Sequence, residues 1–125
     1  MNMHIGQFAE RTGLSSRTLR HYEAIGLIPP TGRTEGGFRL YTEEDLRRLM
    51  TIRRMKALGY STAEMGELLE LLDVLEDEAA DGERRQQARA ALEARLDDAR
   101  ERREKLAAQV ERADEFLGIL QERLG

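Results

Sequence analysis

Hydrophobic and polar residues follow helical spacing in the first quarter of the chain. The segment Ile5–Thr12 predicts a short helix that ends at a glycine, the residue most common just after a helix C-terminus. Ser15 predicts the start of a second helix, because its hydroxyl can accept a hydrogen bond from a free backbone amide. Leu19 and Tyr22, three residues apart, fall on the buried face of that helix. Two short helices joined by a glycine-containing turn indicate a helix-turn-helix.

A turn and a hairpin are expected after the second helix. Gly26 predicts the end of this helix, and Pro29-Pro30 force an extended connection. Gly36-Gly37, with Arg33 before them and Phe38 after them, predict the tip of a β-hairpin. The hairpin would form a wing beside the two helices.

Two longer helices are expected next. Thr42 begins the third, with acidic residues that suit the positive end of the helix, and Gly59 ends it. The segment Ser61–Glu64 forms a capping box for the fourth. Its core face is expected at positions with helical spacing: Met65, Leu68, Leu69 and Leu72.

The last third of the chain predicts one long helix with a coiled-coil seam. Alternating steps of four and three residues select ten positions, of which nine are apolar. They are Leu92, Leu96, Ala99, Arg103, Leu106, Val110, Ala113, Leu117, Leu120 and Leu124. At about 1.5 Å per residue the helix would be on the order of 60 Å long, so the seam needs a partner, most simply a second copy. Arg103 either extends its charge to water or sets register or strand direction.

These patterns divide the 125 residues into three parts. Residues 1–75 are expected to form a winged helix-turn-helix domain and residues 76–82 an acidic linker. Residues 83–125 are expected to form a dimerisation helix. The predicted fold class is mainly α with a small β-hairpin wing.

The net charge of −4 conceals two halves of opposite sign. Residues 1–60 carry ten Lys or Arg against six Asp or Glu, whereas residues 61–125 carry ten against eighteen. Binding to a polyanion is therefore expected in the first half. The chain has no cysteine, which excludes disulfides and thiolate metal sites, and no apolar run long enough to cross a bilayer. We expect a cytoplasmic protein.

Four arginines mark the elements that are expected to protrude. Arg17 and Arg20 lie on the second helix, and Arg33 and Arg39 lie on the two sides of the hairpin. Guanidinium groups bind phosphates and guanine edges. The alternative is a small helical domain whose paired helices have no role in DNA binding.

Other chemistry finds little support in the sequence. His4 and His21 are far apart and lack the spacing of a metal site. The carboxylates of the acidic linker indicate a solvated segment. No order of residues suggests a nucleophile with its base or a phosphate-binding loop, so we expect neither an enzyme nor a cofactor.

Two motifs give the chain a specific resemblance. The segments RTLRHYEAIGL and RTEGGFRLY, within residues 3–72, closely resemble the DNA-binding domain of the MerR family of bacterial transcription regulators. The resemblance implies a winged helix-turn-helix homodimer joined by an antiparallel coiled coil, with each second helix in a major groove. It assigns DNA contacts to Ser16, Arg17, Thr18, Arg20, His21, Tyr22, Arg33, Phe38, Arg39 and Lys56.

Within this set, Tyr22 is expected at a phosphate, and Arg33, Phe38 and Arg39 on the wing. Phe38 and His21 stand where family members often have tyrosine. Phe38 has no hydroxyl for a phosphate, and His21 is shorter than tyrosine.

The resemblance also implies a mechanism. Dimers of this family distort an overlong promoter spacer so that RNA polymerase can engage it, commonly in response to an effector. Thiol-dependent sensors of the family use cysteines, which this chain lacks. The effector therefore stays open among a small organic molecule, a partner protein and none. The alternative function is a coiled-coil adaptor, either for protein interaction or for DNA architecture in the manner of phage excisionases.

Overall fold

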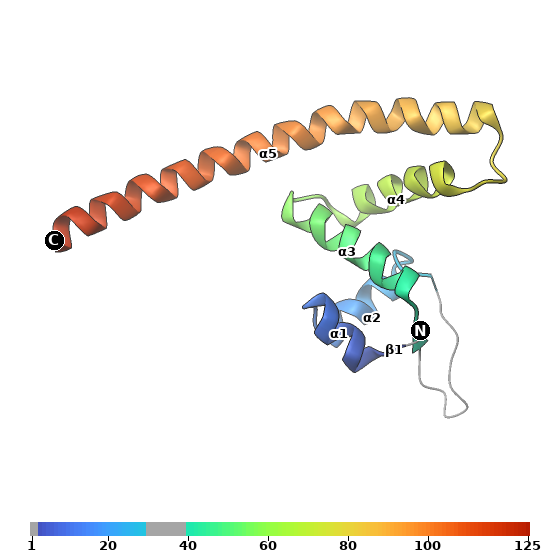
Figure 1. The fold of residues 1–125 in the computed structure, drawn as a ribbon, viewed down its shortest axis with the longest axis horizontal. Helices are drawn as coiled ribbons and strands as arrows, with labels where there is room; N and C mark the ends of the chain where they lie inside the picture. Colours follow the sequence, from blue (N-terminus) through green and yellow to red (C-terminus); the bar gives the residue numbers. More distant parts are fainter. Residues whose placement is uncertain (1–2, 30–39) are drawn as a thin grey trace. The chain divides into compact units, whose positions relative to one another are not determined.

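The computed structural model describes residues 3–29 and 40–125, which form five helices and two short strands in that part of the chain (Figure 1). The elements are β1 (Met3–His4), α1 (Ile5–Thr12), α2 (Ser16–Ala24), β2 (Leu40–Tyr41), α3 (Glu43–Ala57), α4 (Thr62–Glu76) and α5 (Gly82–Leu124). They divide into two compact units, Met1–Glu70 and Leu71–Gly125. This confirms the mainly helical fold class, with a small antiparallel sheet and a long C-terminal helix.

The first two helices end and begin where the sequence predicts. Gly13 follows α1 in the left-handed region at φ +71°, and its N–H donates to Ala9 O over 2.9 Å. Ser15 caps α2, since its Oγ accepts a hydrogen bond of 3.1 Å from the Thr18 amide. Gly26 adopts φ +82° just after α2, a conformation that strongly favours glycine.

A two-stranded antiparallel sheet joins the N-terminus to the segment before α3. Met3 pairs with Tyr41, and His4 pairs with Leu40. The Tyr41 ring is fully buried and stacks on Phe8 of α1 with ring centroids 4.5 Å apart. The sequence did not predict β1, because two residues are too few to show an alternating pattern.

Capping boxes precede both α3 and α4; the sequence predicted the box before α4 and the start of α3 at Thr42. Thr42 Oγ1 accepts from the Asp45 amide, and the Asp45 carboxylate accepts from the Thr42 amide over 2.9 Å. Ser61 and Glu64 make the same reciprocal pair before α4. Each box satisfies amides that have no partner within the helix.

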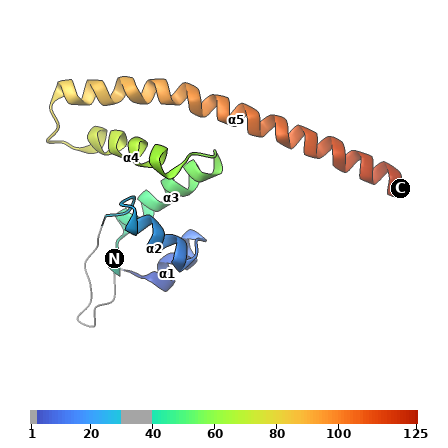
Figure 2. The ribbon, with the colours of Figure 1, turned by 180° about the vertical axis from the view of Figure 1, so that it is seen from behind.

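The core of the first unit lies where α1 packs against α2, α3 and β2. Figures 1 and 2 show these elements grouped together from opposite sides. Its buried apolar residues include Met3, Phe8, Leu19, Tyr22, Leu27, Ile28, Tyr41, Leu49, Ile52, Met55 and Tyr60. Burial of these side chains supplies the main driving force for folding of the unit.

The second unit consists mainly of α5. Asp81 caps it, since its Oδ1 accepts a hydrogen bond of 2.7 Å from the Arg84 amide. The helix begins at Gly82, one residue earlier than predicted, and continues without interruption for 43 residues. Although α5 is long, its charged residues leave no window apolar enough to cross a bilayer, and the same is true of the other described helices.

Candidate nucleic-acid interface

One face of α2 carries cationic side chains, and the opposite face is buried. Arg17, Arg20 and His21 are exposed and lie three and four residues apart, so they share one surface of the helix. Leu19 and Tyr22 face the core, with exposures of 0% and 4%. Burial of these two residues fixes the rotation of the helix and directs both guanidinium groups toward solvent.

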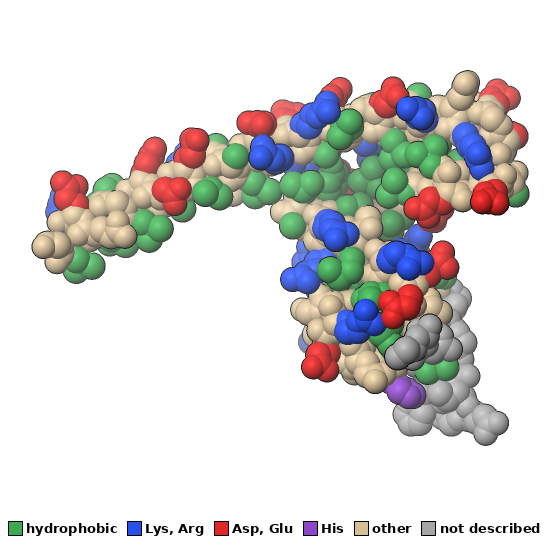
Figure 3. Space-filling view, in the orientation of Figure 1, with side chains coloured by type: hydrophobic (Ala, Val, Ile, Leu, Met, Phe, Trp, Pro, Cys, Tyr) green, Lys and Arg blue, Asp and Glu red, His purple; other side chains and the backbone are tan. Residues whose placement is uncertain are grey.

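The two arginines of α2 are available for a ligand. Within the described residues, neither Arg17 nor Arg20 forms an ion pair, although Arg11 does so with Glu43 over 2.8 Å. Figure 3 shows Lys and Arg side chains over the first unit. Free guanidinium groups on an exposed helix suit phosphate oxygens and base edges.

The polar residues at the start of α2 are partly committed to the cap. The Ser15 and Thr18 hydroxyls are hydrogen-bonded to each other at 2.9 Å, while Ser16 is half-buried. Thr18 would have to exchange this bond to reach a ligand. The structure leaves the predicted DNA contacts of Ser16 and Thr18 as predictions.

His21 and Tyr22 differ in accessibility. The His21 ring is exposed and lies 6.1 Å, centroid to centroid, from the Tyr22 ring. Tyr22 belongs to the core, so a phosphate could meet only the rim of its side chain. Lys56 is exposed in the last turn of α3, which leaves its ammonium group free to approach a backbone phosphate.

Three predicted wing residues, Arg33, Phe38 and Arg39, lie outside the described residues, as does the tip at Gly36-Gly37. Tyr41, in the strand that follows these residues, donates a hydrogen bond of 2.9 Å from its Oη to the Glu23 carboxylate of α2.

Two arginines of α3 hold the helix-turn-helix together, and the sequence did not single them out. Arg53 Nη1 donates to Thr12 O over 3.0 Å at the end of α1, and Arg48 Nε donates to Leu27 O over 2.8 Å after α2. Thr12 O belongs to the last turn of α1, where carbonyl oxygens have no partner within the helix, and Arg53 supplies one. Leu27 lies in the connection after α2, and Arg48 supplies a donor to its carbonyl oxygen. At least two of the arginines of α3 therefore have a structural role and do not serve only as surface charge.

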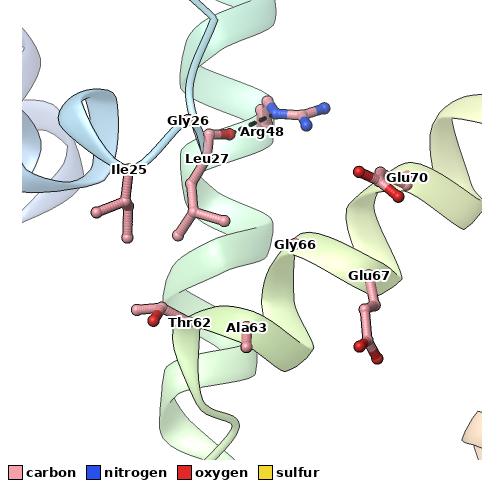
Figure 4. A pocket seen from close by; sticks show the side chains of 9 residues that line it. All are labelled: Ile25, Gly26, Leu27, Arg48, Thr62, Ala63, Gly66, Glu67 and Glu70. Carbon is pink, nitrogen blue, oxygen red and sulfur yellow. Dashed lines mark hydrogen bonds between the residues drawn. The ribbon is translucent and has the colours of Figure 1, made fainter.

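A shallow hollow of about 290 Å³ lies between the turn after α2, α3 and the first half of α4 (Figure 4). It is lined by Ile25, Gly26, Leu27, Arg48, Thr62, Ala63, Gly66, Glu67 and Glu70. A Cβ atom at residue 66 would meet Leu27 Cδ2 at 3.7 Å, an ordinary contact, so the hollow does not depend on this glycine. None of the predicted site residues lines it.

The second unit presents an apolar surface along α5. Large hydrophobic side chains are exposed at Leu96, Leu106, Val110, Phe116, Leu117, Ile119, Leu120 and Leu124. Figure 3 shows hydrophobic groups open to solvent along the C-terminal part of this helix. Exposed apolar area of this extent marks an interaction surface.

Comparison with known proteins bears on what these surfaces do. Residues 3–72, more than half of the chain, match the MerR HTH family of regulatory proteins. The chain belongs to the MerR family. The match spans β1 to the end of the core face of α4 and so includes the exposed arginine face of α2.

Relatives of this MerR-family chain include regulators from several bacteria. The mercuric resistance operon regulatory protein of Bacillus cereus is 41% identical over 73 residues, which are 58% of this chain and 55% of the relative. The chain thus spans about half of that relative's length. The regulator CueR of Salmonella typhi is 34% identical over 110 residues, which are 87% of this chain and 80% of CueR.

A solved structure is similar over nearly the whole MerR-family chain. It is that of HiNmlR, a MerR family regulator lacking the sensor domain, bound to promoter DNA. The two chains are 27% identical with a TM-score of 0.67, and the comparison covers 99% of this chain and 88% of HiNmlR. The similarity therefore extends over both units.

Metal-binding groups are not assembled in the described part of this MerR-family chain. Over residues 3–29 and 40–125, no three His, Cys, Asp or Glu side chains lie close enough together to hold a metal ion. The sequence contains no cysteine at all.

Proposed function

We propose that the protein is a sequence-specific DNA-binding regulator of transcription. The observation that carries this proposal is the exposed face of α2, where Arg17 and Arg20 stand free of ion pairs in the described residues of a MerR-family helix-turn-helix. A helix of this kind fits a major groove, where a guanidinium can donate two hydrogen bonds to one guanine. We place the protein in the cytoplasm, with its promoter DNA.

The proposed binding unit is a homodimer on a palindromic promoter site. The exposed seam of α5 supplies the dimer contact, and each protomer contributes one α2 and one wing. Two-fold symmetry of the protein then matches two-fold symmetry of the site, with half-sites separated by a whole number of DNA turns. The similar regulator HiNmlR is bound to promoter DNA, which supports promoter DNA as the ligand.

The proposed action is distortion of the spacer between two promoter elements. Arg33 and Arg39 of the wing hold the backbone beside the groove that α2 enters, and the deformation energy of the DNA is offset by these contacts. RNA polymerase is the proposed partner, because it binds the two promoter elements once they are realigned. The effector is a signal still to be identified, and no catalytic step is part of the proposal.

The test is a footprint of the full chain on the DNA upstream of its own gene, at physiological salt and with polymerase present. Two symmetric protected half-sites inside a promoter spacer are expected, with affinity at least about 10³-fold above that for random duplex. Arg112→Ala, at an exposed position of α5, serves as a control that keeps this affinity. Equal affinity for the upstream DNA and for random duplex would refute the proposed role as a sequence-specific regulator. Protection without two symmetric half-sites would favour an architectural adaptor.

A further inference from the structure

The seam of α5 contains one residue that does not fit an apolar interface. Arg103 occupies a seam position, yet its side chain is 75% exposed and its charge lies 3.6 Å from Glu104 of the same helix. The neighbouring apolar positions are open as well, with exposures of 60% at Val110 and 38% at Leu106. The single chain therefore leaves the seam exposed from Arg103 to Leu124, whereas Leu92 and Ala99 are partly buried.

We propose that Arg103 fixes the register of an antiparallel α5 pair centred at the level of Ala108, with Arg103 opposite Ala113 of the partner subunit. The proposal rests on the homodimer proposed above and specifies its contact. Facing residues are then equally distant from Ala108 along the sequence, which pairs Leu106 with the partner's Val110.

Two registers give Arg103 space: a centre at Ala108 sets it opposite the partner's Ala113, and a centre at Glu101 sets it opposite the partner's Ala99. In an antiparallel coiled coil each layer joins an a position to a d position, so allowed registers differ by whole heptads. Shifting the pair by one heptad sets Arg103 against the partner's Leu106 or the partner's Leu120. Alanine leaves room for the aliphatic stem of arginine to cross the seam and bring its charge to water, whereas leucine fills that room.

The other seam positions agree with the register centred at Ala108. Centring at Ala108 places each of the ten seam residues opposite another, including Leu96 with the partner's Leu120 and Ala99 with the partner's Leu117. A centre at Glu101 would instead set Ala113 against the partner's Arg89 and Leu117 against the partner's Arg85. A shift by one heptad in the same direction would set Leu120 against the partner's Arg89.

A parallel pair is unfavourable for the same residue. It would place Arg103 directly against the partner's Arg103 inside the seam, where like charges repel at short distance. It would also bring Arg95 beside the partner's Arg100, a second repulsive pair. The antiparallel arrangement separates these charges.

Flanking charges add a specific contact. In the register centred at Ala108, Arg100 lies beside the partner's Asp114, and two-fold symmetry produces the contact twice. Arg100 can reach the partner's Asp114, because its side chain is 69% exposed. Its present ion pair with Asp97, 3.6 Å from Nη1 to Oδ1, is open to solvent and therefore weak. The same register brings Arg95 near the partner's Arg123, a repulsion that acts against the two attractive contacts.

Spin-label distances in the full chain test the register. The chain has no cysteine, so Glu101→Cys, Glu115→Cys and Glu122→Cys each give one labelled position on the outer side of α5. We expect equal distances between subunits at 101 and 115, each with an axial offset of about 21 Å, and a larger offset of about 42 Å at 122. A shift by one heptad would make the first two differ by about 21 Å, and a parallel pair would make all three alike.

The possible outcomes separate the two proposals. Unequal distances at 101 and 115, or three equal distances, overturn the register while the homodimer stands. A monomeric mass with no coupling between labels overturns the homodimer and the register together. Equal distances at 101 and 115 with a longer one at 122 support both.

A charge exchange gives a second test. Asp114→Arg should raise the dimer dissociation constant about five- to tenfold, because two attractive pairs become repulsive, and adding Arg100→Asp should restore it. Glu111→Arg, also exposed on α5 but away from the seam, is the matched control and should change it less than twofold. Failure of the double variant to recover would overturn the assigned pair.

Discussion

The hydroxyl of Tyr41 donates a hydrogen bond of 2.9 Å to the Glu23 carboxylate, and so ties β2 to the last turn of α2. The tyrosine ring is fully buried against Phe8, which leaves the hydroxyl at the edge of the core. One side chain thereby links the helix that carries Arg17 to the strand that follows the predicted wing.

Tyr41→Phe should lower the free energy of unfolding by about 1.5–3 kcal/mol, because a hydrogen bond to a charged group is lost while the stack on Phe8 remains. Urea denaturation measures the change. Glu23→Gln keeps an acceptor for the same hydroxyl and should cost less. Equal stability of wild type and Tyr41→Phe would show that the bond contributes nothing.

Thr12 is a buried polar residue whose hydroxyl closes the end of α1. Its Oγ1 donates to Phe8 O over 2.9 Å and accepts from the Leu14 amide over 3.3 Å. Thr12→Val keeps the shape but leaves that amide without its partner, so it should cost about 1–3 kcal/mol of unfolding free energy. Thr51→Val is the matched control, since Thr51 donates to Arg47 O at an exposed site, and it should cost less than about 0.5 kcal/mol. Similar losses in both variants would contradict the role of burial.

The starts and ends of the helices could be predicted from the sequence because each depends on a few neighbouring residues. Ser15, Thr42 and the Ser61–Glu64 box cap helices through hydrogen bonds that reach only three residues along the chain. The left-handed glycines after α1, α2 and α3 follow the same local rule. Long helical segments with strong periodicity leave few alternatives.

The contacts that hold the helix-turn-helix together could not be predicted in this way. Arg53 meets Thr12 O across 41 positions of sequence, and Tyr41 meets Glu23 across 18. No local pattern distinguishes these side chains from solvated ones, because only the packed core brings them together. The exposed face of α2 was predictable, since burial of Leu19 alternates with exposure of Arg17 and Arg20 at helical spacing.

The ion pair between Arg11 and Glu43 should make stability depend on pH. The hydrogen bond from Arg11 lowers the pKa of Glu43 below its ordinary value, and the charge of Arg11 adds to this effect. Because the folded pKa is the lower one, the stabilisation is present above the ordinary carboxyl pKa and is lost as pH falls through the folded value. The urea midpoint of wild type should exceed that of Glu43→Gln at pH 7, and the gap should close below about pH 4.

Both side chains of this pair are about half exposed, so salt should narrow the gap as well. Glu44→Gln in the same first turn of α3 controls for the helix dipole, which acts on both positions. A gap that persists unchanged at pH 3 would exclude the ion pair as its source.

Arg17 and Arg39 should affect DNA binding in different ways if α2 reads bases and the wing holds the backbone. Arg17→Ala should cost about 1–3 kcal/mol on the specific site and relax the preference at one base pair, because a bidentate contact to a base edge is lost. Arg39→Ala should weaken binding to every duplex, because one phosphate contact is lost. Binding then releases about one counterion fewer, so the slope of log affinity against log salt concentration should become shallower by about one. Binding isotherms on specific and random duplexes at several salt concentrations separate the two effects. Each variant removes one positive charge, so a difference between the two variants must come from where the arginine lies and not from the change in net charge. A uniform loss of affinity across all sequences for Arg17→Ala would show that Arg17 of α2 does not read a base.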